Sequence, residues 1–293
     1  MHEDGSVSIE DVERWTADHP GESLDYLFIA YTAKQFSHSS NDDMEAVHVI
    51  AQHATRDAGL RAYWIGCSCM PDERELEQDV YRISDVIRGA SGLVIALGPS
   101  TTARTTEQML QQWGSRMWTY PEVLLSPDSN IKVYSRSNKT AQVFPKRQFA
   151  ATVWTDGNLS RQLIDHYEGN LILSRLELVT LALICLHGRE TSEYLRGDHS
   201  YALMGLLRLR PKVDSTDSAF QAFARLSLAN DSDMLLERLI FTLPKSPDQH
   251  WSVMDDAWDV KLWDIYPICQ VAGVGHDDTV IIVCLSYRTW EHH

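Results

Sequence analysis

Trp118 and Glu122 are the pair of side chains whose types and spacing best suit chemistry in this chain. They lie four residues apart in the segment SRMWTYPEVLL, residues 115–125. Four residues make about one helical turn, so a helix here would carry an aromatic ring and a carboxylate on one face. A carboxylate in that position can stabilise a substrate cation. Two alternatives stay open: Glu122 as a solvated or Arg116-paired residue of a helix surface, and Trp118 as a core residue.

The chain before this segment alternates between apolar runs and amphipathic stretches. The runs predict strands, and apolar residues at three- and four-residue spacing between them predict helices. This order indicates an α/β fold with a parallel sheet flanked by helices. The expected strands are 23–31, 60–68, 93–98 and 130–136, and the expected helices are 42–58, 71–90 and 105–113.

In open α/β sheets, ligands bind at the carboxyl ends of the strands. The loops at 32–41, 67–72 and 98–104 follow the first three expected strands and therefore meet at that edge. We expect Glu122 to face a cleft there, near Tyr31 and the 67–72 loop.

The pattern changes beyond residue 150. Helices are expected at 158–167, 174–188, 198–209 and 217–241, and β-branched and aromatic residues after Trp251 predict strands, the clearest at 280–287. This division predicts a mainly helical extension and a C-terminal β-rich segment. The predicted parts are an N-terminal tail at 1–22, a core at 23–150, the helical extension at 151–245 and the β-rich segment at 246–293.

The formal net charge of −15 argues against general binding to nucleic acid or to an anionic membrane. Residues 130–149 form a basic stretch that could bind phosphate, although a solvated strand and loop is the favoured interpretation. The longest apolar run, Leu178–Leu186, is shorter than the ~20 residues of a membrane span, and the N-terminus lacks a signal-peptide core. We therefore expect a cytoplasmic protein.

Neither cysteines nor histidines show metal-ligand spacing. Five cysteines without a disulfide or zinc framework fit a reducing compartment, and no HExxH-like pair of histidines occurs. We therefore predict no metal and no prosthetic group. Neither a P-loop nor a complete dinucleotide fingerprint occurs either.

Several stretches, taken in order, resemble the HET (heterokaryon incompatibility) domain of fungi. The resemblance covers roughly residues 24–210, and the stretch Glu73–Gly98 matches the family's amphipathic helix and apolar strand. Three features depart from the family pattern: its second-strand aspartate is Gly66 here, its tryptophan-glycine after the first strand is absent, and the glutamine before its glutamate is Pro121. The other matching motifs are FIAY at Phe28–Tyr31, YWIGCSCM at Tyr63–Met70, RMWTYPE at Arg116–Glu122 and YALMGL at Tyr201–Leu206.

HET domains are similar to TIR domains, which implies a flavodoxin-like (TIR-like) parallel sheet. Enzymatic TIR domains carry a tryptophan-cysteine-x-x-glutamate motif whose glutamate serves to cleave the nicotinamide–ribose bond of NAD. Trp118, Thr119 and Glu122 occupy these positions here. The resemblance thus implies an NAD hydrolase with NAD as substrate.

Under this hypothesis Glu122 is the catalytic residue and stabilises the ribosyl cation, while Trp118 shapes the wall of the site. Phe28, Tyr31 and Lys34 are the expected cofactor-contacting residues, placed by the same resemblance. The expected biology is nonself recognition and programmed cell death, with a homo-oligomer on activation. The alternative is a non-catalytic signalling module that self-associates through the same sheet and helices.

Overall fold

A five-stranded sheet organises the first half of the chain. Its strand order is β2-β1-β3-β4-β5; the first four strands are parallel, and β5 pairs with β4 in antiparallel register. The predicted α/β class with a mostly parallel sheet flanked by helices is confirmed. The strands are β1 (Tyr26–Ala30), β2 (Ala62–Ile65), β3 (Gly92–Leu97), β4 (Asn130–Ser135) and β5 (Asn138–Pro145).

The computed structural model divides into a sheet unit, Met1–Asp72 with Ile83–Ile164, and a helical unit, Glu73–Arg82 with Asp165–His293. It describes residues 12–66, 76–98, 104–190, 197–212, 216–229, 269–276 and 279–284, together with Ser8, Asp214 and Arg238. The expected loop at 67–72 and most of the one at 98–104 lie outside these residues.

Strand β5 and the helix after it were not predicted from the sequence. Only Arg136 and Ser137 separate β4 from β5, and so short a link permits only antiparallel pairing, because a parallel strand needs a longer crossover. Helix α6 (Lys146–Val153) then begins directly at the end of β5. The basic stretch at 130–149 is therefore a hairpin and a helix.

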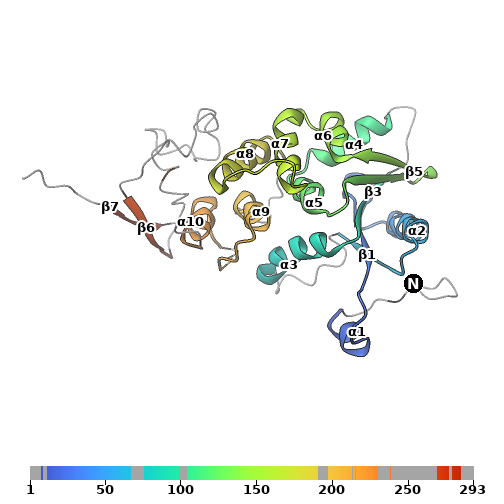
Figure 1. The fold of residues 1–293 in the computed structure, drawn as a ribbon, viewed down its shortest axis with the longest axis horizontal. Helices are drawn as coiled ribbons and strands as arrows, with labels where there is room; N and C mark the ends of the chain where they lie inside the picture. The colour runs from blue at the N-terminus through green and yellow to red at the C-terminus, as the bar shows by residue number, and fades with distance from the viewer. Residues whose placement is uncertain are drawn as a thin grey trace, which may run out of the picture. The chain divides into compact units, whose positions relative to one another are not determined.

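One face of the sheet is covered by α2 (Asn41–Asp57), as Figure 1 shows. Apolar residues of α2 pack there against alternate residues of the strands, including Leu27 and Ile29 of β1. Ser40 caps the helix by accepting a hydrogen bond from the Asp43 amide. The expected helix at 42–58 thus matches α2 closely.

The opposite face carries α4 (Thr106–Gly114), α5 (Thr119–Leu125) and α6, and the C-terminal part of α3 (Leu76–Gly89) (Figure 1). The Tyr26 hydroxyl donates to the Val86 carbonyl at 2.6 Å and so ties β1 to α3. Trp154 links α5 to α6, because its ring packs edge-on against the rings of Tyr120 and Phe149, with centroid distances of 4.7 Å and 5.9 Å. This aromatic packing fixes α5, the helix that carries Glu122.

The helical unit has its own core. Helix α9 packs against both α8 and α10, and α10 packs against β6 of a small antiparallel sheet. Strand β7 confirms the start of the strand expected at 280–287, whereas the helix expected at 217–241 is described only as far as Ala229. The elements are α8 (Arg175–His187), α9 (Asp198–Leu207), α10 (Ala219–Ala229), β6 (Cys269–Val274) and β7 (Val280–Cys284); α1 (Val12–Asp18) precedes the sheet, and α7 (Gly157–Tyr167) spans the boundary between the units.

Candidate functional site

Glu122 lies in the short helix α5, whose other residues are all buried. Its side chain as a whole is partly buried, but its Oε2 atom is fully buried and has no hydrogen-bond partner among the described residues. Buried polar atoms are nearly always hydrogen-bonded, so this carboxyl oxygen is an exception that calls for an explanation.

The protonation of Glu122 follows from this environment. Burial raises the pKa of its carboxyl from the ordinary value of 4.5 to about 8, and the positive charge of Arg116 acts in the opposite direction. Burial is the larger of these two effects. The carboxyl is thus mostly protonated at pH 7. The alternative of an ion pair between Glu122 and Arg116 finds no support, since no salt bridge joins these two residues in the described part of the chain.

Trp118 stands at the N-cap position of α5 and is partly buried. Its backbone angles, φ −67° and ψ −23°, are already helical. The four-residue spacing to Glu122 therefore follows helical geometry, as the sequence predicts. The turn before it is held by Thr119, whose hydroxyl donates to the Arg116 carbonyl at 2.7 Å.

Phe28 and Tyr31, two of the expected cofactor contacts, take part in packing. Phe28 is fully buried in β1, where it lies opposite Trp64 and Leu93 in register. Tyr31 is 6% exposed and belongs to the core beneath α2, on the face away from α5. The structure therefore does not bring Tyr31 and Glu122 together.

Lys34, the third expected cofactor contact, is exposed in the turn after β1. No hydrogen bond between described residues joins it to Glu122, whose Oε2 has no partner. All five predicted site residues are thus described, but no hydrogen bond or ring contact in the described structure joins Phe28, Tyr31 or Lys34 to Glu122. The 67–72 loop that was expected beside Glu122 lies outside the described residues.

A polar residue that sequence reasoning missed joins the ends of β1 and β3. The side-chain oxygen of Gln35 accepts a hydrogen bond from the Gly98 amide at 3.0 Å, and its nitrogen donates to the Met109 carbonyl at 2.8 Å. The same nitrogen lies 3.4 Å from Oε1 of Gln112. Gln35 therefore bridges three segments at the carboxyl edge of the sheet.

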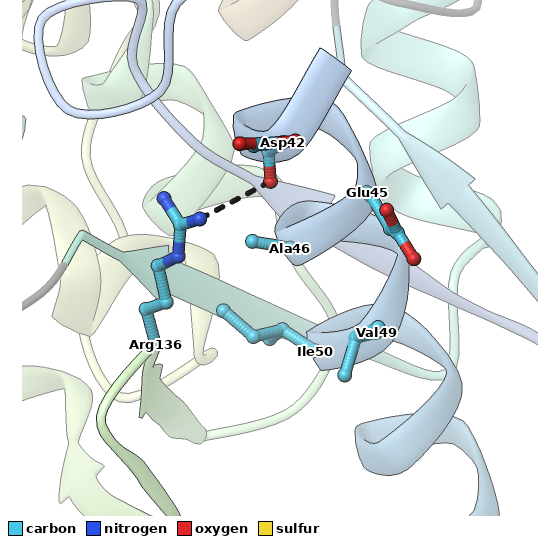
Figure 2. A pocket seen from close by; sticks show the side chains of 6 residues that line it. All are labelled: Asp42, Glu45, Ala46, Val49, Ile50 and Arg136. Carbon is cyan, nitrogen blue, oxygen red and sulfur yellow. Dashed lines mark hydrogen bonds between the residues drawn. The ribbon is translucent and has the colours of Figure 1, made fainter. Parts of the chain in front are cut away.

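A shallow pocket of about 310 Å³ lies over α2 (Figure 2). Its apolar wall comes from α2, and Arg136 from the β4–β5 turn closes one side. Figure 2 shows the Arg136 guanidinium turned toward α2, where it donates to the Asp42 carbonyl at 3.3 Å. Arg136 also pairs with Asp43 at 2.6 Å, so its charge is already neutralised. This pocket contains none of the predicted site residues.

The Asp43 carboxyl in this ion pair is held in its charged form. A hydrogen bond from the Ser37 amide lowers its pKa, and Arg136 lowers it further. The cation that the basic stretch offers here is therefore already engaged within the chain, which weakens the expectation of a phosphate site at this position.

Among the described residues, no three His, Cys, Asp or Glu side chains gather as a metal site. No helix in the described part of the chain is long and apolar enough to cross a membrane. Comparison of the chain with protein-family models, curated proteins and solved structures returned no match.

Proposed function

We propose that this chain is a HET/TIR-like domain that cleaves the nicotinamide–ribose bond of NAD, with Glu122 as the catalytic residue. The observation that carries the proposal is the buried Oε2 of Glu122, which has no hydrogen-bond partner within the described structure. A purely structural glutamate gains nothing from such a position, whereas strongly perturbed carboxyls are concentrated at functional sites. The proposed biological setting is nonself recognition and programmed cell death in the cytoplasm.

The chemistry of this bond requires the charged form of Glu122, which substrate binding favours. Cleavage of an N-glycosidic bond develops positive charge on the ribose, and a carboxylate beside it stabilises that charge. The nicotinamide of NAD is already cationic and leaves as a neutral base. Binding of this cation next to Glu122 lowers the pKa of the carboxyl, which releases its proton to solvent and takes the charged form that the reaction needs. The electrons of the broken C–N bond leave with nicotinamide, and a water molecule adds to the ribosyl cation and gives up a proton.

The strand order supports the proposal at the level of the fold. An order of 2-1-3-4-5 is also that of flavodoxin-like sheets, in which ligands bind at the carboxyl edge. The antiparallel β5 differs from a fully parallel five-stranded sheet. We propose the TIR-like variant of this fold, with NAD as substrate, no prosthetic group and a homo-oligomer as the active form.

The test is release of nicotinamide from NAD at high protein concentration, where self-association can complete a site. Glu122→Gln replaces the carboxyl by a neutral group of the same shape, and Glu107→Gln makes the same change at an exposed residue of α4. We expect release from the wild type and the Glu107 variant, and a loss of about 10²-fold or more in the Glu122 variant. Equal release from all three proteins would exclude Glu122 as the catalytic residue.

The alternative function is a non-catalytic, self-associating signalling module. The observation that favours it is the use of Phe28 and Tyr31 in packing, because side chains enclosed in two separate cores cannot contact NAD without rearrangement. Under this alternative, folded protein releases no nicotinamide at any concentration, and Glu122→Gln leaves self-association unchanged.

A further inference from the structure

Gln35 fills a position that offers two backbone partners at once. The Gly98 amide donates to its side-chain oxygen at 3.0 Å, and the Met109 carbonyl accepts from its side-chain nitrogen at 2.8 Å. Both Gly98 and Met109 are buried. Without Gln35, this amide and this carbonyl would lose a partner in a place that water reaches poorly.

The position is the point in the sheet where a ligand is expected. Strands β1 and β3 are parallel neighbours, and their carboxyl ends lead into Gln35 and Gly98 respectively. The next helix after β1 is α2, on one face of the sheet, and the next helix after β3 is α4, on the other (Figure 1). Connections that diverge in this way open the crevice at which α/β sheets bind ligands.

The turn after β1 closes tightly over this point. The Thr32 carbonyl accepts from the amides of Gln35 and Phe36, both at 3.0 Å. A Cβ atom at position 98 would lie 3.2 Å from the Gln35 carbonyl oxygen, so glycine permits the close approach. The Thr32 hydroxyl is buried in the same turn and has no hydrogen-bond partner in the described structure.

One donor beside one acceptor recognises a specific chemical group. A primary carboxamide, such as the side chain of Gln35, presents a carbonyl oxygen and an NH₂ side by side. A carboxylate of the same shape only accepts hydrogen bonds, so it would face the Met109 carbonyl with a like-signed oxygen. The pair formed by Gly98 and Met109 therefore selects carboxamides over carboxylates.

We propose that the Gly98 amide and the Met109 carbonyl form a binding site for the carboxamide of nicotinamide, which Gln35 occupies as an internal substitute in the ligand-free chain. The choice of nicotinamide rests on the proposed function. Entry of the ligand requires the Gln35 side chain to turn away, so the free chain binds it weakly. An internal occupant lowers the apparent affinity, because that affinity is the intrinsic affinity multiplied by the fraction of time that the site is open.

The experiment compares binding of nicotinamide and nicotinic acid to the wild type, Gln35→Ala and Gln142→Ala by isothermal titration. Gln142 is an exposed glutamine of β5 and serves as the matched control. We expect Gln35→Ala to bind nicotinamide at least about tenfold more tightly than the wild type does, to discriminate against nicotinic acid, and to differ from Gln142→Ala. A folded Gln35→Ala protein that binds nicotinamide no better, or binds both ligands equally, would show Gln35 to be a structural brace only.

A second measurement covers the case in which Gln35→Ala does not fold. In the wild type, nicotinamide at high concentration should shift the NMR signals of the Gly98 amide and the Gln35 side-chain NH₂, and nicotinic acid should not. Unchanged signals overturn the proposal. Nicotinamide has no glycosidic bond, so its binding is independent of cleavage: binding without cleavage of NAD counts against the proposed function alone, and cleavage without binding counts against this site alone.

Discussion

Replacing Glu122 with glutamine should change how the stability of the protein depends on pH. The folded-state pKa of Glu122 is raised by burial to about 8, above the ordinary value of 4.5 that the unfolded chain restores. Between these two pH values the folded protein keeps a proton that the unfolded chain has released. The stabilising effect of the protonated carboxyl is therefore complete below pH 4.5 and is lost as the pH rises toward 8.

The size of this loss follows from the shift. Each pKa unit corresponds to about 1.4 kcal/mol, so the free energy of unfolding should fall by about 3 kcal/mol between pH 4.5 and pH 7, and by about 5 kcal/mol once the pH exceeds 8. Glutamine does not titrate and keeps the shape of the side chain. As the pH rises, Glu122→Gln should therefore gain stability relative to the wild type by these amounts. The contributions of all other groups cancel in this difference.

Urea denaturation of both proteins at a series of pH values measures this difference. Glu107→Gln is the control, because Glu107 is exposed on α4 and its replacement should give a profile parallel to that of the wild type. If the Glu122→Gln and wild-type profiles are also parallel, the carboxyl is solvated in solution and the reasoning from its burial is wrong.

Two further predictions concern a tight helix contact and a buried ion pair. Gly114→Ala should lower the free energy of unfolding by about 1–3 kcal/mol, because the new Cβ would lie 2.3 Å from a methyl group of Val153 and 2.8 Å from the Trp154 indole nitrogen. Thermal unfolding measures this loss. An unchanged midpoint would contradict the prediction and show that α6 shifts without cost. Arg225→Met should lower it by about 3–5 kcal/mol, because Asp217 is buried and would lose its two-pronged guanidinium partner. In denaturation by urea, the added change Asp217→Leu should restore much of that loss, and a double variant no more stable than the single one would contradict this origin.

The strands and helices that the sequence predicted are those with a continuous apolar run or with apolar residues at regular helical spacing. The run 93–97 lies fully buried in β3, and the apolar spacing from Met44 to Ala58 follows α2 and its C-cap. Hairpin strand β5 was missed because its residues alternate weakly and its turn lacks glycine. Its pairing is decided by the short link to β4, which periodicity does not reveal.

The candidate site also has a part that the sequence predicts and a part that only the folded structure reveals. The spacing of Trp118 and Glu122 is local, and it holds because the helical backbone extends through Trp118. The burial of Glu122 depends on how α5 packs in the fold, so no local pattern could predict it. Gln35 was missed for a similar reason, since Gly98 and Met109 lie 63 and 74 residues away along the chain.

The most direct test of the central claim is the pH dependence of kcat/KM for release of nicotinamide from NAD. This ratio reports the pKa values of the free protein, so a catalytic Glu122 should make it rise about tenfold per pH unit from pH 6 and level off near pH 8. Glu122→Gln should abolish the rise together with the activity. A wild-type profile that is flat across this range, or a rise that persists in Glu122→Gln, would contradict the assignment of the buried Glu122 carboxyl as the catalytic group.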